Sequence, residues 1–335
     1  MAGIKDIAVY IPAKRIKTGE IRDTLGQFAN HGIKEKAVAS FDEDSFTMAV
    51  EAGNRLLGKH HLPPASISFL AVASTSLPYS EKSSAASFLL ALGLPQNILA
   101  MEFTNSPRAA TTALLAANFY LNSSEQNTYA LVISAELPLG RARNDLAHRA
   151  GAAAAAVLLS RSEYCLEIKD FSSYHDEFPG LSFKSYSERE KSDLGIQSYS
   201  EKAFKEVTGK ALRQLLDKTS SSLGDYAFIA LPQPDARLPL LLARSLKLPR
   251  EQYEKALTAP LLGELGCSSP FVSLHQLFDE VKKGDNILLL AYGSGSGCDA
   301  VALKVEEPPI RDDSYREPTP EYISFIEYLK ERQLL

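Results

Sequence analysis

The chain has 335 residues, of which 45% are hydrophobic and 23% are charged, and its formal net charge is −5. Such a composition is typical of a globular protein with one large domain or two fused ones. The acidic balance excludes a general nucleic-acid binder, and no uninterrupted apolar run reaches the about 18 residues that a membrane span needs.

In the first half of the chain, apolar runs predict alternating strands and helices. An opening strand over 4–12 ends at a proline, and an acidic start at 42–44 leads into an amphipathic helix. The pattern then predicts strands over 67–74, 98–103, 129–134 and 153–159, and helices over 83–92 and 107–121. These strands are continuous apolar runs rather than alternating ones, which is typical of strands buried on both faces.

The second half repeats this order of elements. It predicts strands over 226–231, 286–291 and 300–305, helices over 238–245 and 269–281, and a loop around 259–264. A Leu-Pro break falls in the same place in each half, at 92–95 and at 246–249. The repeat favours a duplicated α/β fold with five layers, α-β-α-β-α. A generic doubly wound α/β protein with accidental similarity between its halves stays open.

Domain boundaries follow from this repeat. We expect one half over 1–165, the other over 166–305, and a linker with a helical tail over 306–335. Residues 171–200 are rich in Ser, Tyr and charge and predict a surface excursion. Within the tail, residues 306–319 form a polar, proline-marked linker. Apolar residues of 320–335 lie largely on one helical face, and we expect this helix to pack on its own domain, with docking to a partner left open.

The cysteines are Cys165, Cys267 and Cys298, and they are widely spaced. This usage suits a reducing cytoplasm, and the spacing forms no zinc pattern. The first residues lack the charged-then-apolar pattern of a signal peptide. We therefore expect a cytoplasmic protein without a bound metal.

The turn between the strand ending near residue 103 and the helix near 107 is the most informative stretch. Exposed N–H groups and the helix dipole stabilise negative charge at such a point, and a thiolate there has a lowered pKa. This turn contains Asn105, Ser106, Pro107 and Arg108 and no cysteine. Ser106 is either a nucleophile that needs a base or, as we favour, the cap of a helix that Pro107 begins.

Several motifs together resemble one family. They are the segments 35–38 and 41–52, the segment 72–79 after a predicted strand, and the glycine-rich 292–300 near the end. Together with the opening strand and the tail, they resemble the thiolase superfamily, and within it the archaeal-type 3-hydroxy-3-methylglutaryl-CoA synthases and the ketoacyl synthase III-like proteins. The resemblance covers nearly the whole chain. It implies the duplicated thiolase-like fold and a homodimer or larger assembly.

This resemblance also implies a catalytic set of Cys, Glu, His and Asn, in which the cysteine takes an acyl group from a CoA thioester. Matched residue by residue, the cysteine falls at Asn105, Ser106 or Pro107. The glutamate falls at Thr75, the histidine at Pro232 and the asparagine at Glu264. All these positions are substituted.

Glu264 has two interpretations. It is either a buried general base with a raised pKa, or, as we favour, the partner of Arg108 in an ion pair that fills the former site. Cys267 lies at the small-residue start of the helix predicted over 269–281, and we expect a buried packing role for it. The glycine-rich loop 293–297 is either the border of the active-site cavity, as in the family, or a tight turn between buried strands.

The function expected first is that of a non-catalytic or repurposed thiolase-fold subunit in a CoA-dependent acyl-transfer or condensation assembly. One alternative is an active acyltransferase or synthase in which Ser106 or Glu264 carries the chemistry. Another is a simple CoA- or acyl-binding module. The resemblance implies a CoA thioester as substrate or ligand, no covalent cofactor, and a thiolase and a small zinc-ribbon/OB-fold protein as partners. Neither nucleic acid nor membrane is expected as a partner.

Overall fold

A computed structural model describes residues 2–26, 29–79, 81–124, 128–137, 145–185, 188, 190–309 and 318–334. Residues 310–317 of the expected linker therefore lie outside the described part of the chain. Within the described ranges, no helix has the length and apolar character needed to cross a membrane.

A mixed sheet of nine strands forms the centre of the molecule, in the order β5-β4-β6-β7-β1-β8-β11-β10-β9. Its strands are β1 Gly3–Tyr10, β4 Ile67–Ala73, β5 Leu99–Phe103, β6 Tyr129–Glu136, β7 Ala153–Ser160, β8 Leu166–His175, β9 Phe228–Ala230, β10 Asn286–Gly293 and β11 Gly297–Val305. The pairs β4–β5, β4–β6 and β9–β10 are parallel, and the others are antiparallel. Their apolar residues explain this placement, since most of these strands are buried on both faces.

The sheet has a natural division between β1 and β8. These strands pair only at Gly3↔Glu167 and Ile4↔Leu166, whereas β8 and β11 pair along nearly their whole length. One half thus contains β5-β4-β6-β7-β1 and the other contains β8-β11-β10-β9. The halves have the same kind of parallel core closed by antiparallel strands, as the sequence repeat predicted.

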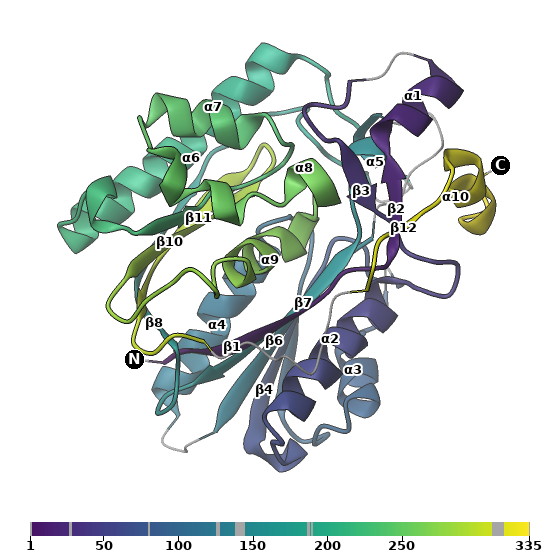
Figure 1. Ribbon diagram of the computed structural model, residues 1–335. Coiled ribbons are helices and arrows are strands. Elements are labelled where there is room, and N and C mark those ends of the chain that lie inside the picture. Colours follow the sequence, from purple (N-terminus) through teal and green to yellow (C-terminus); the bar gives the residue numbers. More distant parts are fainter. Residues whose placement is uncertain are drawn as a thin grey trace.

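Helices form three layers around these two halves of the sheet. In the middle layer, α4 (Ala109–Ser123) contacts α9 (Ser269–His275), and both pack against strands. The outer layers are α2 (Ser45–Lys59) and α3 (Ala85–Ala91) on the first half, and α6 (Gln197–Thr219) and α7 (Leu238–Ser245) on the second. Figure 1 shows these outer pairs on opposite sides with α4 and α9 between them. The predicted five-layer α-β-α-β-α arrangement is confirmed.

Separate apolar clusters fill the spaces between these layers. The inner cluster surrounds α4 and α9 and includes Leu114, Leu121 and Phe271. Another cluster lies under α2 and α3, and a third under α6 and α7. Burial of apolar surface on both faces of each half sheet supplies the main stabilisation and fixes the strand ends that carry the site.

The segment 171–200, expected to be a surface excursion, is partly regular structure. Its first residues complete β8, and its last residues begin α6. The polar residues hid both elements, because the apolar stripe of α6, including Phe204, Val207 and Leu215, starts only after residue 200. Helix α4 begins at Ala109, two residues later than predicted, and α9 ends earlier than the predicted 281. Strand β5 is a half-exposed edge strand, not a buried one.

A small sheet lies outside these layers and contains the tail. Strands β12 (Glu321–Tyr322), β2 (Lys14–Lys17) and β3 (Glu35–Ala37) form it in that order. Helix α10 (Phe325–Glu331) buries Phe325, Tyr328 and Leu329 in one cluster with Ile16, Ile21 and Val38. The expectation that the tail packs on its own domain is therefore confirmed. The remaining short helices are α1 Thr18–Leu25, α5 Asp145–Arg149 and α8 Ala259–Leu262, with 3-10 turns at Pro64–Ser66, Leu223–Asp225, Arg250–Gln252, Glu254–Ala256 and Gly266–Ser268.

Candidate functional site

The turn between β5 and α4 has an unusual backbone. Asn105 is exposed and has a φ of 67°, in the left-handed region that asparagine tolerates better than most residues. The N–H of Ala109 donates to the carbonyl of Ser106 at 2.9 Å, so Pro107 and Arg108 form a separate turn before the helix. The prediction that Ser106 caps a helix begun by Pro107 is wrong. Among the described residues, the Ser106 Oγ accepts one long hydrogen bond, of 3.4 Å, from the N–H of Arg108.

Ser106 is half-buried against the second half of the chain. A Cβ atom added to Gly293 would lie 2.3 Å from the Ser106 Oγ, so only glycine leaves room for this hydroxyl. On the other side, the Cys267 Sγ donates to the Ser106 carbonyl at 3.2 Å. The Ser106 hydroxyl is therefore packed against the β10–β11 hairpin, and Ser106 lines none of the cavities described below.

A small cavity of about 20 Å³ lies where most of the family positions meet. Pro107, Pro232 and Glu264 line it, together with Gly266. The structure therefore brings together the positions matched to the cysteine, the histidine and the asparagine. A space of this size holds about one water molecule. Pro107 and Pro232 are two of the residues that bound it.

An adjoining cavity of about 370 Å³ contains more of the predicted residues. Thr75, Asn105, Pro107 and Glu264 all line it. Its apolar wall includes Leu137, Leu146, Phe178, Leu181 and Phe183. The glycine-rich loop between β10 and β11 contributes residues 294–296, so it is both a tight turn and a cavity border.

Sequence reasoning missed Glu136 at the end of β6. This carboxylate is 4% exposed and accepts from the Thr75 Oγ1 at 2.8 Å and from the N–H of Cys267 at 3.2 Å. Gly266, with a φ of 49°, permits this approach, since a Cβ there would lie 2.4 Å from the Glu136 Oε2. One signal in the sequence could have found it, because Glu136 is an acidic residue at the end of an apolar run. That run forms β6, the parallel neighbour of β4, and ligand sites lie at the carboxyl ends of parallel strands.

Cys267 has the packing role that the sequence predicted. It is completely buried in the 3-10 turn that precedes α9. Burial, and then the neighbouring Glu136 carboxylate, raise the pKa of this thiol well above its usual value. Cys267 is therefore a protonated thiol at neutral pH and not a thiolate nucleophile.

Arg108 does not pair with Glu264, and that prediction is wrong. The Arg108 Nη1 lies 2.7 Å from the Asp299 Oδ1, and Arg108 also contacts His175. Asp299 is 1% exposed and accepts from the Thr111 Oγ1 at 2.7 Å and from the Ser173 Oγ at 2.5 Å. The carboxylate on β11 is the nearer partner, so the guanidinium turns toward the second half of the sheet and away from the cavities.

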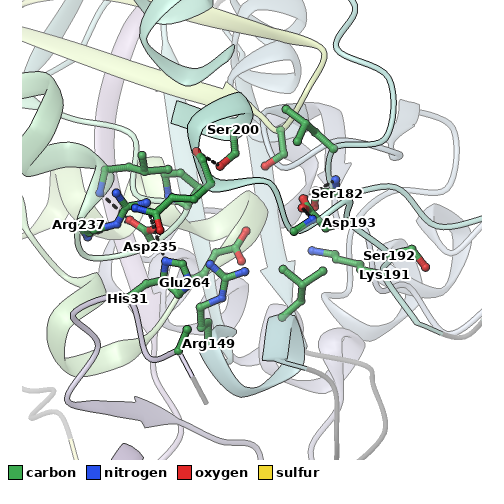
Figure 2. A pocket seen from close by; sticks show the side chains of 18 of the residues that line it. His31, Arg149, Ser182, Lys191, Ser192, Asp193, Ser200, Asp235, Arg237 and Glu264 are labelled. Carbon is green, nitrogen blue, oxygen red and sulfur yellow. Dashed lines mark hydrogen bonds and ion pairs between the residues drawn. The ribbon is translucent and has the colours of Figure 1, made fainter. Parts of the chain in front are cut away.

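The cationic neighbours of Glu264 are instead Arg149, at the end of α5, and Lys191, in the irregular segment before α6. Burial raises the pKa of the Glu264 carboxyl, while Lys191 and Arg149 act in the opposite direction. Burial alone would lower the pKa of Lys191, but the Glu264 and Glu136 carboxylates raise it. Figure 2 shows Lys191 and Arg149 extending toward Glu264. Glu264 lines every cavity described here.

The largest of these cavities, about 710 Å³, opens beside Glu264. Its polar lining includes His31, Arg149, Lys191, Asp193, Asp235 and Arg237 (Figure 2). Leu146, Leu181, Ser182, Lys191, Glu264 and Ser294 line both this cavity and the 370 Å³ one. Of its charged lining residues, only Glu264 could be predicted from the sequence. The others come from α5 and from loops far apart in the chain, and no local pattern marks them.

The described ranges contain no group of three or more His, Cys, Asp or Glu residues placed to hold a metal ion. Cys165, Cys267 and Cys298 are free thiols.

The fold and the site together define a thiolase-like protein, and comparisons with known proteins agree. Residues 216–305 match the family described as 3-oxoacyl-[acyl-carrier-protein] synthase III C terminal. A crystal structure of HMG-CoA synthase complexed with CoA has a TM-score of 0.85 at 18% identity, and the match covers 98% of this chain and 89% of that one. The curacin pathway HMG synthase in complex with an acetyl donor acyl carrier protein has a TM-score of 0.83 at 19% identity, covering 98% and 88%.

Sequence relatives identify the family within this class. The hydroxymethylglutaryl-CoA synthase of Aeropyrum pernix is 31% identical over 314 residues, which cover 91% of this chain and 85% of the relative. The hydroxymethylglutaryl-CoA synthase of Pyrobaculum aerophilum is 28% identical over 348 residues, covering 99% and 98%. The chain belongs to the hydroxymethylglutaryl-CoA synthase family.

Proposed function

We propose that this protein binds a CoA thioester without forming a covalent acyl-enzyme, and that it serves as a subunit of a condensation or acyl-transfer assembly. The observation that carries this proposal is that the described residues at the start of α4 offer no activated nucleophile. The cavity that Pro107 and Pro232 line together measures only about 20 Å³, and the larger cavities that Glu264 also lines adjoin it. The two candidate groups there are the hydroxyl of the half-buried Ser106 and a buried, protonated thiol at Cys267.

Covalent acyl transfer needs an activated nucleophile with a base in hydrogen-bond reach. The Ser106 Oγ has its polar contact with the N–H of Arg108, not with an acceptor that would remove its proton. The Cys267 thiol donates to a backbone carbonyl instead of facing a cavity. Both arrangements favour a structural role for these groups.

The open cavities support ligand binding. Spaces of about 370 and 710 Å³ fall in the range of small-molecule sites. The 370 Å³ cavity has an apolar wall, and polar residues line the region that both cavities share. This combination suits a ligand in which an acyl chain is joined to a polar carrier. Sequence relatives are named hydroxymethylglutaryl-CoA synthase, and a structural neighbour is described as complexed with CoA.

Two measurements on the purified chain test this proposal. Calorimetric titration with acetyl-CoA is expected to show saturable binding. Intact-mass spectrometry after incubation with acetyl-CoA is expected to show the unmodified chain. A stable mass increase of one acetyl group would overturn the proposal, and so would the absence of any binding to CoA or acetyl-CoA.

The assembly partners are proposed from the family resemblance. We propose that a second copy of this chain, a thiolase and a small zinc-ribbon/OB-fold protein complete the assembly. Co-expression of the three chains from one source tests this, because a stable complex should elute together in size exclusion and should condense acetyl-CoA with acetoacetyl-CoA. A simple CoA-binding module would instead bind CoA with no protein partner.

An active condensing enzyme is a second candidate, because Glu264 lines all the described cavities and has a raised pKa. If Glu264 is the acid or base of such an enzyme, Glu264→Gln should lower turnover by about 10²-fold or more while the fold stays intact. Glu251→Gln, at an exposed position on the second half, is the matched control. Our proposal expects neither variant to change condensation by the purified chain, because the chain alone has none.

A further inference from the structure

A histidine and a buried aspartate form an oriented pair at the edge of the 710 Å³ cavity. The His31 Nδ1 lies 3.3 Å from the Asp235 Oδ2. Asp235 is 2% exposed, and its Oδ1 accepts from the N–H groups of Arg237 and Leu238 at 2.8 and 2.6 Å. The carboxylate is thus fixed at the start of α7 and holds the imidazole beside the cavity, as Figure 2 shows.

This arrangement selects the tautomer of the imidazole. A carboxylate beside Nδ1 favours the proton on Nδ1, which leaves the Nε2 lone pair as a proton acceptor. The backbone at His31 has a φ of 47°, which is uncommon for a residue with a side chain. Its loop is held to the second half by the Lys34 N–H, which donates to the Pro260 carbonyl at 2.8 Å. Strained residues held in this way concentrate at functional sites.

The groups around His31 complement a polarised carbonyl. Arg149 and Lys191 line the same cavity, and the Arg149 Nε is buried with no hydrogen-bond partner within the described part of the chain. Arg237, directly before α7, also lines this space, and the acidic groups that line it are Glu190, Asp193, Asp235 and Glu264. Asp193 accepts from the N–H groups of Ser182 and Gly195 at 3.0 and 2.7 Å, which holds its charge in the wall of the cavity.

We propose that His31 is a proton acceptor that activates water to hydrolyse a thioester held in this cavity. The inference rests on the proposed binding of a CoA thioester. The water oxygen forms a bond to the carbonyl carbon while the His31 Nε2 takes a water proton. The negative charge on the carbonyl oxygen is stabilised by Arg149 and Lys191. The carbon–sulfur bond then breaks, the imidazolium returns its proton to the leaving thiolate, and a carboxylic acid and a thiol are released.

The chain offers a matched control pair. The His60 Nε2 lies 2.7 Å from the Oδ2 of Asp6, which is 3% exposed. Asp6 also pairs with Lys59 at 2.6 Å, and His60 lines none of the cavities described here. His60→Gln therefore removes a histidine–aspartate pair of the same chemistry from a place without a ligand cavity.

The test measures thiol release from acetyl-CoA and acetoacetyl-CoA with a chromogenic thiol reagent, across pH. The wild-type rate should exceed the buffer rate and rise with pH, because a general base acts only in its proton-free form. His31→Gln should lower this rate by about 10²-fold and abolish the rise, with acetyl-CoA affinity changed by less than about threefold. His60→Gln should match the wild type. Asp235→Asn should lower the rate and alter the pH profile, and its melting temperature checks that α7 remains folded.

The outcomes separate this inference from the proposed function. Binding of acetyl-CoA without thiol release above buffer overturns the role of His31 and leaves the proposed binding intact. Equal rates for wild type and His31→Gln also overturn it. A rate that survives His31→Gln but is lost in Glu264→Gln would assign the base to Glu264 instead. Absence of binding would overturn the proposed function first.

Discussion

At the scale of single residues, Arg108 joins the two halves of the molecule. It stands directly before α4 in the first half and pairs with Asp299 on β11 in the second. Ser173 on β8 and Thr111 on α4 complete the set of hydrogen bonds to this buried carboxylate. The Arg108–Asp299 contact holds the start of α4, and with it the turn at Ser106 and Pro107, against the second half of the sheet.

Arg108→Ala should lower the free energy of unfolding by about 3 kcal/mol, because it leaves the buried Asp299 charge without its cation. Urea unfolding followed by circular dichroism measures the change. Arg250→Ala, which removes an exposed ion pair with Glu254, should change it by less than about 1 kcal/mol. Equal effects of the two variants would contradict a structural role for the Arg108–Asp299 pair.

At the scale of elements, the tail helix α10 covers a buried lysine. Lys36 on β3 is 0% exposed, and its Nζ lies 5.1 Å from the ring centroid of Tyr328 on α10. Burial lowers the pKa of Lys36 to about 7. Its Cβ also lies 3.1 Å from a Cβ built on Gly263, the residue before Glu264. The tail therefore packs over a buried lysine that lies next to Gly263, the residue before Glu264.

Stability should rise with pH because of this lysine. In the unfolded chain a lysine titrates near a pKa of about 10.4, and in the folded chain Lys36 titrates at about 7. Between these values the unfolded state binds more protons, so the free energy of unfolding increases with pH. Lys36→Met should raise the melting temperature at pH 7 and flatten the increase between pH 7 and pH 9.

The exposed Lys202→Met is the control for that measurement, and its melting temperature should follow the wild type at both pH values. If the melting temperatures of Lys36→Met and of the wild type rise by the same amount between pH 7 and pH 9, the burial of Lys36 does not cause the pH dependence of stability.

At the scale of the whole molecule, the large sheet ends in β5. Within the described part of this single chain, β5 pairs with β4 on one side only, and Leu99 and Met101 on it are exposed. An edge strand with exposed apolar side chains is a template for pairing with another strand. We propose that a second copy pairs here in antiparallel fashion, since such pairing of identical strands satisfies the same backbone groups on both chains.

Met101→Lys should convert a wild-type dimer to a monomer in sedimentation velocity, because the charge is placed at the centre of the paired edge. Leu90→Lys, at an exposed position on α3, should remain dimeric. A monomeric wild type, or a dimer unaffected by Met101→Lys, would contradict pairing through β5.

Much of the fold could be predicted from local patterns. The apolar runs located β4, β6, β7, β10 and α7 to within about two residues. The repeat of elements then indicated the layers. α6 was missed because its polar beginning lies in a segment without clear periodicity, and α4 started late because Asn105 adopts a left-handed backbone that no sequence period encodes.

For the candidate site, the sequence identified positions but not partners. It placed Thr75, Pro107, Pro232 and Glu264 as members of one site, and the structure brings them to adjoining cavities. It paired Arg108 with the wrong carboxylate, because the partner of a long side chain depends on distances across the fold.

The sequence by itself determined the duplicated α/β fold and which side chains stand at the ends of its strands, since hydrophobic periodicity and order along the chain are local properties. Only the tertiary structure decided how those side chains combine. It turned Arg108 toward Asp299, set Glu136 against Thr75, and brought His31 to Asp235 beside Glu264. The physical reason is that charges and hydrogen bonds act over a few ångströms, and only packing of the two halves brings groups this distant in sequence within that range.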